Sequence, residues 1–213
     1  AAPLGYTCHI FGPEADPPAG QVAEGVTVAD YLDEEALAAF AEVVDVVTLE
    51  FENVPTECVE FLARKVAVRP GAKALATAQD RLVEKDFAAA NGCATAPYAA
   101  VNSLDELKAA MANFGPRAVL KTRRMGYDGK GHVMLGRDTD PAAAWAALAG
   151  VQSILEGFVP FEGEVSVIAA RALDGTVAAY PPIANRHRDH ILDTSTVPAG
   201  LEPRQAERAI TLA

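Results

Sequence analysis

The chain of 213 residues can form one large domain or two small ones, and half of its residues are hydrophobic. This composition excludes a mainly disordered chain, and no apolar run approaches the roughly 18 residues that a membrane-spanning helix needs, so we expect no membrane protein. The formal net charge of −11 argues against nucleic-acid binding, because such binding needs an extended basic surface. The three scattered cysteines lack metal-ligand spacing and are typical of thiols in a reducing compartment.

The first third of the chain has the pattern of a parallel sheet with helical crossovers. Strands are expected over residues 6–11, 46–51 and 66–68, with helices over 34–44 and 56–65. Such sheets bind ligands at the carboxyl ends of their strands. The acidic turn that holds Glu50, Glu52 and Asn53 therefore lies where a ligand could bind.

The rest of the chain predicts a second domain, with the boundary near residues 74–79. A long helix is expected over 71–91, closed by a C-cap at Asn91-Gly92, and Ser103 with Glu106 forms a capping box. An antiparallel meander is expected over 163–194, with a turn at Asp174-Gly175. The remaining predicted elements are strand 98–101, helix 104–114, strands 118–122 and 132–135, helix 141–149, strand 153–158 and a helix that is still open at residue 213.

The most informative stretch is VLKTRRMGYDGKGH, residues 119–132. Lys121 ends a strand, and Gly126, Gly129 and Gly131 follow within a short loop that also holds Lys130. Glycines let the backbone approach an anion and turn its N–H groups toward it, and lysines add point charges. The pattern indicates a flap over phosphates and not a Walker A loop, whose spacing and following helix it lacks. The alternative is a solvated hairpin with incidental cations.

Two later stretches also carry polar groups in a suggestive order. In ILEGFVPFEGEVSV (154–167) an apolar strand ends at Glu156, and the next residues could form a hinge that presents backbone groups to a purine. Glu164 opens another strand, where its carboxylate could accept hydrogen bonds from ribose hydroxyls. Taken singly, each glutamate could equally be a solvated surface residue. His187 and His190 lie in a basic segment suited to an anion or a nucleotide, whereas zinc is not expected because a third ligand is missing.

Together these segments resemble the 5-(carboxyamino)imidazole ribonucleotide synthases, which are biotin-carboxylase-type ATP-grasp enzymes. The resemblance is carried by TLEFENVP (48–55), AQDRLVEKDF (78–87), TAPY (95–98), VLKTRRMGYDGKG (119–131), EGFVPFEGEVSV (156–167) and YPPIANRHRDHILDTS (180–195). It implies an α/β (α+β) fold with a Rossmann-like pre-ATP-grasp domain over 1–76 and an ATP-grasp domain over 77–213. A lid subdomain is expected over about 97–157.

The resemblance also implies roles for individual residues. Arg81 and Lys121 would contact phosphates, the flap over 126–132 would close on them, residues 156–159 would hold adenine, and Asp128 with Tyr127 would face the second substrate. Lys121 and Asp128 are the expected catalytic residues. The expected nucleotide contacts are Arg81, Lys121, Gly126, Tyr127, Asp128, Gly129, Lys130, Gly131, His132, Glu156, Gly157, Phe158, Val159, Glu164 and His187.

The reaction that the resemblance implies is a carboxylation in purine biosynthesis. ATP would phosphorylate bicarbonate to carboxyphosphate, and the carbon dioxide released from it would be transferred to the amine of aminoimidazole ribonucleotide, leaving ADP and phosphate. The family's opening glycine loop and its Mg²⁺ ligands are expected outside residues 1–213, so this chain alone is expected to be inactive. A cytoplasmic homodimer is also implied. The alternatives are a formate-dependent glycinamide ribonucleotide transformylase and a non-catalytic nucleotide-binding domain.

Overall fold

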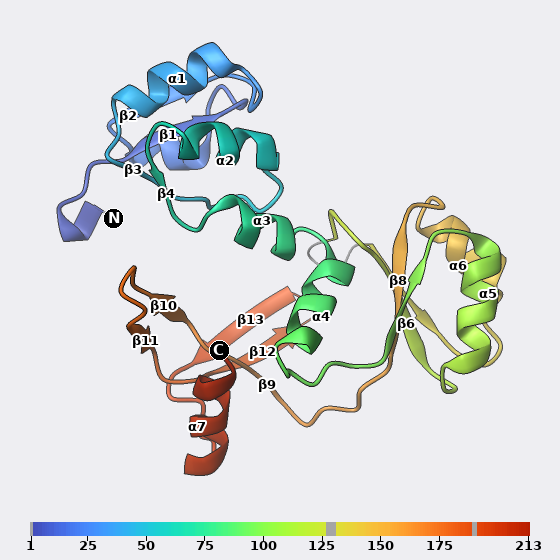
Figure 1. Ribbon diagram of the computed structural model, residues 1–213. Helices are drawn as coiled ribbons and strands as arrows, with labels where there is room; N and C mark the ends of the chain where they lie inside the picture. Colours follow the sequence, from blue (N-terminus) through green and yellow to red (C-terminus); the bar gives the residue numbers. More distant parts are fainter. Residues whose placement is uncertain (1, 127–130, 189–190) are drawn as a thin grey trace. The chain divides into compact units, whose positions relative to one another are not determined.

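The computed structural model describes residues 2–126, 131–188 and 191–213. It divides into two compact units, residues 1–84 and 85–213 (Figure 1). Within the described residues, no helix combines the length and the apolar character required to cross a bilayer.

The first unit is built from parallel strand pairs and the helices between them. Its elements, in order, are η1 (Ala2–Leu4), β1 (His9–Gly12), η2 (Pro18–Val22), β2 (Gly25–Val28), α1 (Glu34–Glu42), β3 (Val46–Val47), α2 (Thr56–Ala63), β4 (Ala67–Val68) and α3 (Ala72–Ala78). β1 pairs with β2 and β3 pairs with β4, both in parallel. The predicted parallel crossover over β3, α2 and β4 is therefore confirmed, but β2 was not predicted and the strands form two separate pairs.

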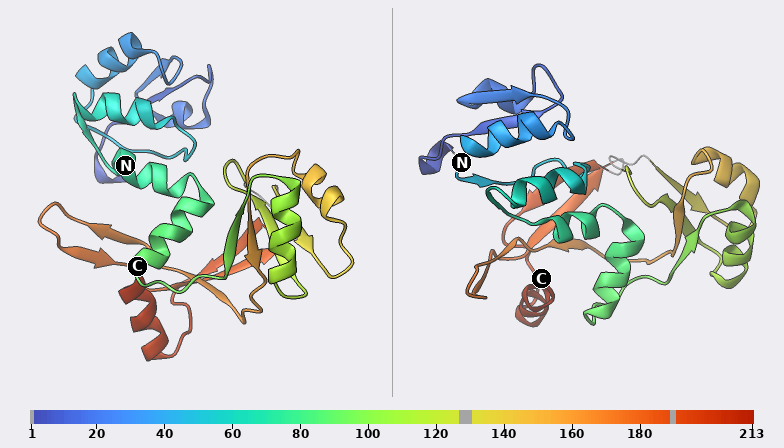
Figure 2. Two further views of the ribbon diagram at one scale, coloured as in Figure 1. Left: turned by 45° about the vertical axis from the view of Figure 1, so that its right-hand side comes forward. Right: turned by 45° about the horizontal axis from the view of Figure 1, so that its top comes forward.

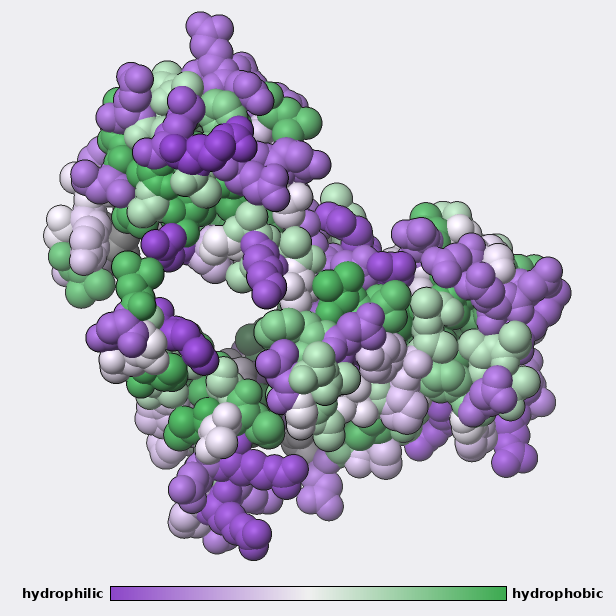
Figure 3. Space-filling model, in the orientation of Figure 1, coloured by the Kyte–Doolittle hydropathy of each residue, from purple (hydrophilic) through white to green (hydrophobic). Residues whose placement is uncertain are grey.

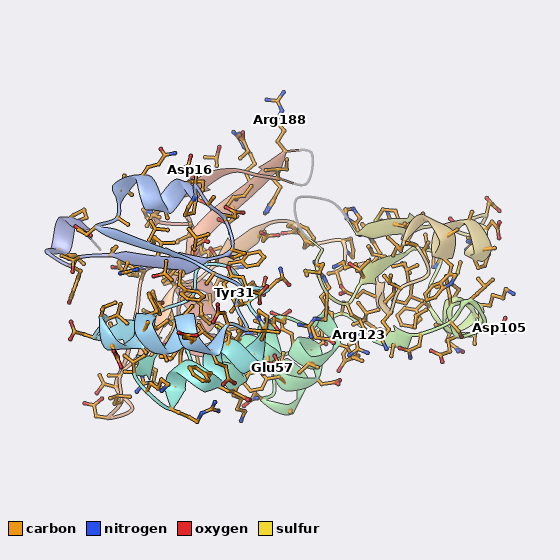
Figure 4. The ribbon with its side chains drawn as sticks, turned by 90° about the horizontal axis from the view of Figure 1, so that it is seen from above. Asp16, Tyr31, Glu57, Asp105, Arg123 and Arg188 are labelled. Atoms are coloured by element: carbon orange, nitrogen blue, oxygen red, sulfur yellow. The ribbon has the colours of Figure 1, made fainter. Side chains whose placement is uncertain are left out.

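The helices of this unit form where caps and apolar spacing favour them. The Asp33 carboxylate caps α1 by accepting a hydrogen bond from the Ala36 N–H at 3.0 Å. α1 then buries Leu37 and Phe40 against Val59 and Leu62 of α2. Aromatic packing extends this core, because Phe11 lies between Phe40 and Tyr31, the latter labelled in Figure 4.

The predicted strand over 46–51 is wrong in its length, since β3 ends at Val47. The reason is a side chain that the local pattern does not reveal. The buried Gln79 amide donates hydrogen bonds to the backbone carbonyls of Glu52 at 2.7 Å and Val54 at 2.6 Å. These bonds hold the chain in a turn that satisfies its backbone without a neighbouring strand.

The predicted single helix over 71–91 is also wrong, because the chain forms α3 and then α4 (Arg81–Ala90). Asp80 starts the second helix: its carboxylate accepts a hydrogen bond from the Leu82 N–H at 3.0 Å, and its carbonyl accepts one from Glu84. The predicted C-cap is confirmed. Gly92 has φ +78°, and the Cys93 N–H donates to the Ala88 carbonyl, as in a Schellman motif.

The second unit contains a four-stranded antiparallel sheet with two helices on one face (Figures 1 and 2). Its sheet order is β5-β8-β6-β7. Its elements are β5 (Tyr98–Val101), α5 (Leu104–Asn113), β6 (Ala118–Thr122), β7 (His132–Leu135), α6 (Pro141–Ala147) and β8 (Ser153–Gly157). Ser103 caps α5 as predicted, but the Glu106 carboxylate accepts from the Asn102 N–H and thus completes the capping box one residue early.

The remainder of the second unit is a three-stranded sheet, a hairpin and a C-terminal helix. Its elements are β9 (Glu164–Ser166), β10 (Ala169–Arg171), β11 (Val177–Ala179), β12 (Ile183–Arg188), β13 (Ile191–Thr196) and α7 (Pro203–Leu212). The predicted meander is wrong in connectivity, because β9 pairs with β12 in the order β13-β12-β9.

β10 and β11 form a separate hairpin that projects as an arm in both views of Figure 2. Its predicted turn at Asp174-Gly175 is confirmed by a φ of +88° at Gly175. α7 presents a mainly hydrophilic surface in Figure 3.

Candidate functional site

The pleat of the β5-β8-β6-β7 sheet separates core residues from polar ones. Leu120 and Leu155 are fully buried in the cluster that also contains the buried face of α5. Because side chains alternate along a strand, their neighbours Lys121 and Glu156 lie on the opposite face. The register places Lys121 across from His132 of β7 and places Glu156 across from Val119. Three predicted nucleotide contacts, Lys121, His132 and Glu156, thus share the face that α5 and α6 leave uncovered.

Two lysines meet one carboxylate on this face. The Lys121 ammonium lies 2.9 Å from Glu156 Oε2, and the Lys85 ammonium lies 3.5 Å from the same oxygen. The Glu156 side chain is 10% exposed, and those of Lys85 and Lys121 are 17% and 31% exposed. Because the ions are partly withdrawn from water, their interactions are screened less than those of a surface pair.

A tyrosine and an aspartate adjoin the lysine pair. The Tyr98 hydroxyl donates a hydrogen bond of 2.6 Å to Asp86 Oδ1, and the Lys85 ammonium lies 5.7 Å from the centre of the Tyr98 ring. The hydrogen bond to Asp86 is the main cause that raises the pKa of Tyr98. Tyr98 is directly opposite Glu156 in the β5–β8 register, so α4 and the polar face of the sheet are linked at this point.

The ends of the predicted flap lie close together. The Thr122 N–H donates to the Gly131 carbonyl at 2.8 Å, and the N–H of Arg123, labelled in Figure 4, donates to Gln152. Gly131 has φ +72°, and a Cβ placed on it would lie 3.3 Å from the Gly126 Cα. The β6 and β8 pairing therefore continues past Thr122, and the flap leaves the sheet from a narrow base. Tyr127, Asp128, Gly129 and Lys130, all predicted site residues, lie outside the described residues.

The predicted hinge follows β8 without a break. Its Gly157 N–H donates to the Pro97 carbonyl at 2.8 Å, and its Phe158 N–H donates to the Arg117 carbonyl at 3.3 Å. In the described part of the chain, the Val159 N–H donates no hydrogen bond. Of these three N–H groups, Val159 therefore supplies the donor that a ligand could use.

A cavity of about 420 Å³ lies beside the hinge. Arg117 and Phe158 line it, with the guanidinium carbon 3.9 Å from the centre of the phenyl ring. The other lining residues are Pro97, Asn113, Phe114, Gly115, Pro116, Gly157 and Pro160. The lining carries no carboxylate, so it differs in character from the Lys121 face.

Two further predicted residues come together on the β13-β12-β9 sheet. Glu164 opens β9 and is paired in register with Asn185 of β12. His187 lies two residues further along β12, and its Nδ1 is 3.5 Å from Glu164 Oε1. Both side chains are partly exposed, at 47% and 37%. They form a second polar site that the chain connects to Glu156 through a segment of fewer than ten residues.

The other predicted residues that the structure describes, Arg81 and the acidic turn, belong to the first unit. Arg81 begins α4 and belongs to the first unit, whereas Lys85, one turn later, belongs to the second. Glu50, Glu52 and Asn53 lie in the turn that Gln79 holds. Sequence reasoning missed Lys85, although its position one helical turn after Arg81 was a signal that the two cations share a helix face.

Comparisons with known proteins agree with this architecture. Residues 86–213 match the ATP-grasp domain family, and residues 1–79 match the ribonucleotide synthetase preATP-grasp domain. The chain therefore belongs to the ATP-grasp family.

Within that family it is similar to N5-carboxyaminoimidazole ribonucleotide synthases. The one from Brucella melitensis is 47% identical over 215 residues, an alignment that covers 100% of this chain and 59% of the relative.

Two solved structures of such enzymes show the same fold. An ADP complex of an N5-carboxyaminoimidazole ribonucleotide synthetase has a TM-score of 0.92 and 36% identity, and the match covers 99% of this chain and 56% of that one. The synthetase from Thermus thermophilus has a TM-score of 0.89 and 40% identity, with 99% and 57% covered. The chain thus spans a little over half the length of the relatives it matches.

Proposed function

We propose that the protein is an ATP-dependent carbon–nitrogen ligase that carboxylates 5-aminoimidazole ribonucleotide with bicarbonate. Carboxyphosphate is the proposed intermediate, and the products are 5-(carboxyamino)imidazole ribonucleotide, ADP and phosphate. The observation that carries the proposal is the convergence of Lys85 and Lys121 on Glu156, on the face of the β5-β8-β6-β7 sheet opposite α5 and α6. The similarity to N5-carboxyaminoimidazole ribonucleotide synthases supports this choice of substrate. We further propose that the protein acts as a cytoplasmic homodimer, as the resemblance of the sequence implies.

The geometry supports separate binding roles for the phosphates, the adenine and the ribose of the nucleotide. We assign Lys121 to the phosphate oxygens, and its partly exposed ammonium near the end of β6 supports this role. We assign the Val159 N–H, which has no backbone acceptor among the described residues, to the edge of the adenine ring. We assign Glu164, with His187 beside it, to the ribose hydroxyls, from which its carboxylate can accept hydrogen bonds.

Catalysis of phosphoryl transfer consists mainly of positioning and charge neutralisation. Lys121 would supply part of that neutralisation to the transferring phosphoryl group. We assign Asp128 and Tyr127 to the ribonucleotide side of the flap, together with backbone contacts from Gly126, Gly129, Lys130 and Gly131. His132 would lie beside Lys121, with which it is paired in register, and Arg81 is assigned to the phosphates.

We propose Mg²⁺ as the metal cofactor that binds with ATP, but the described residues do not form a site that fits this ion. Magnesium prefers six oxygen ligands in an octahedron, and in proteins one or two of these are usually carboxylates. Among the described residues, no three His, Cys, Asp or Glu side chains gather as a metal site. Glu156, the carboxylate beside the lysines, already contacts both ammonium groups. We therefore assign the ion no ligand among the described residues.

The decisive assay measures phosphate release from ATP by the native gene product. Release that requires both aminoimidazole ribonucleotide and bicarbonate is expected. Release that instead requires glycinamide ribonucleotide and formate would identify a transformylase. Nucleotide binding without phosphate release under either condition would indicate a non-catalytic domain.

A single substitution tests the phosphate contact. Lys121→Met removes one charge-assisted interaction, which typically contributes about 1.5–3 kcal/mol, so ADP should bind roughly ten- to a hundredfold more weakly. The matched control is Lys108→Met, because Lys108 is an exposed lysine of the same unit whose partner is Asp105, labelled in Figure 4. Equal ADP affinities for the two variants would remove Lys121 from the site.

A further inference from the structure

The two lysines of the second unit share one carboxylate oxygen, although each comes from a different element. Lys121 is on β6, Lys85 is on α4, and both ammonium groups approach Glu156 Oε2, at 2.9 and 3.5 Å. All three side chains are less than one-third exposed. These three side chains carry two positive charges and one negative charge, so together they have a net charge of +1.

This net charge depends on Lys85. With Lys121 and Glu156 alone, a close ion pair would be electrically neutral and would attract an arriving phosphate only weakly. Lys85 competes for the same oxygen and adds a second positive charge within a few ångströms. Glu156 thereby holds Lys121 in a defined place without cancelling the positive potential of the site.

The structure also fixes Lys85 without help from a ligand. The neighbouring Asp86 accepts a hydrogen bond of 2.6 Å from Tyr98, which attaches this part of α4 to β5. The Lys85 ammonium lies 5.7 Å from the centre of the Tyr98 ring, within the range of a cation–π contact. Tyr98 is opposite Glu156 in the sheet, so the ring and the carboxylate that the ammonium approaches are cross-strand neighbours.

We propose that Lys85 is a positioning residue that acts through Glu156 to keep the Lys121 end of the site positively charged for the phosphates of a nucleotide. This inference rests on the proposed nucleotide site and deepens it. It assigns to the Glu156 side chain a role separate from the backbone hinge that follows it: the carboxylate orients the lysines, and the hinge faces the base.

A cycle of charge-changing variants tests the inference. Lys85→Met lowers the charge of the cluster by one, Glu156→Gln raises it by one, and the double variant restores it. ADP and adenosine binding to the native gene product are measured by calorimetry or competition, with Lys108→Met as the surface control. Thermal unfolding of each variant confirms that the fold persists.

Lys85→Met should weaken ADP binding by about tenfold, a typical coupling between neighbouring charged groups, while adenosine binding stays unchanged. The double variant should bind ADP within about threefold of the unchanged protein. The neutral side chain that Glu156→Gln introduces no longer offsets the charge of Lys121, so the loss of the Lys85 charge is compensated. Lys85→Met should also reduce the dependence of ADP affinity on salt, whereas a purely structural loss would not alter that dependence selectively.

Four results would overturn the inference. A double variant as weak as Lys85→Met would mean that Lys85 touches the nucleotide directly or only supports the fold. Equal losses for ADP and adenosine would place its effect outside the phosphates. If Lys85→Met matches the unchanged protein while that protein binds ADP, the inference alone fails. If the unchanged protein binds no ADP, the proposed function fails as well.

Discussion

Replacing Gly131 with alanine tests how narrowly the base of the flap is built. Gly131 has φ +72°, a conformation that costs a residue with a Cβ about 1–2 kcal/mol. The added Cβ would lie 2.7 Å from Thr122 Oγ1 and 3.6 Å from Thr122 Cγ2. The Gly126 Cα, at 3.3 Å from the added Cβ, is a backbone atom that no side-chain rotation can move. The backbone must therefore shift, which typically costs about a further 1–3 kcal/mol.

The total expected loss for Gly131→Ala is about 2–5 kcal/mol of unfolding free energy. The assay is urea denaturation followed by the fluorescence of Trp145, the chain's only tryptophan, which packs against the core of the same unit. Gly175→Ala is a matched control, because Gly175 has φ +88° but nothing within 4 Å of its would-be Cβ. Gly175→Ala should lose only the backbone part, about 1–2 kcal/mol.

A second variant separates the contact from the backbone term. In the Thr122→Ala background, both Thr122 atoms that meet the new Cβ are gone and only the Gly126 Cα at 3.3 Å remains, so Gly131→Ala should cost less than in the unchanged background but more than Gly175→Ala. If the Gly131→Ala loss in the unchanged background equals that of the control, the contact with Thr122 has no energetic weight and the reasoning is refuted.

Three further changes have expected outcomes. Leu120→Ala deletes a fully buried side chain and should lower the unfolding free energy by about 2–5 kcal/mol, measured through the Trp145 signal. Gln79→Leu leaves two backbone carbonyls without their buried donor and should cost about 1–3 kcal/mol by circular dichroism. Burial raises the pKa of Cys58 from 9.0 to about 11, so at pH 8 a thiol reagent should modify Cys8 and Cys93 well before Cys58. The folded state keeps this proton longer than the unfolded state, so the contribution of Cys58 to stability is complete below about pH 9 and is lost as pH rises through 11.

Local signals were sufficient for the elements that carry Lys121. Strands over 118–122 and 132–135 were predicted with the boundaries that β6 and β7 have. The glycine-rich loop between the two strands and Gly115-Pro116 before the first one mark where these strands begin and end. The caps at Ser103 and Gly92 were predictable for the same reason, because a cap involves only its own helix end.

Long-range contacts determined what local signals could not. The helix over 71–91 breaks where Gln79 reaches carbonyls 25 and 27 residues away, and no property of the segment itself indicates this. The same holds for β9, which pairs with β12 across an intervening hairpin. In both cases the tertiary partner satisfies backbone groups that a helix or an adjacent strand would otherwise satisfy.

In the site, too, local signals identified residues but did not reveal their long-range contacts. The sequence placed Lys121, Glu156, Glu164 and His187 in order along the chain, but it did not indicate which of them touch. Glu156 was expected to open a hinge, whereas its side chain is paired with Lys121, 35 residues away, and with Lys85. A carboxylate on a strand gives no local signal of its partner, because cross-strand neighbours are decided by sheet order.

Each of the strands β6 and β8 thus contributes both to the core and to the site, because successive side chains point to opposite faces of the sheet. In β6, Leu120 faces the core under the helices, whereas Lys121 faces the opposite side of the sheet. β8 repeats the arrangement with Leu155 and Glu156. A shift of either strand by one residue would bury the charged side chains and expose the leucines. The core therefore fixes the register, and the register brings the lysine to its carboxylate. Substitutions at adjacent positions should accordingly have different effects. Replacing a leucine should lower stability, whereas replacing a charged residue should lower nucleotide affinity.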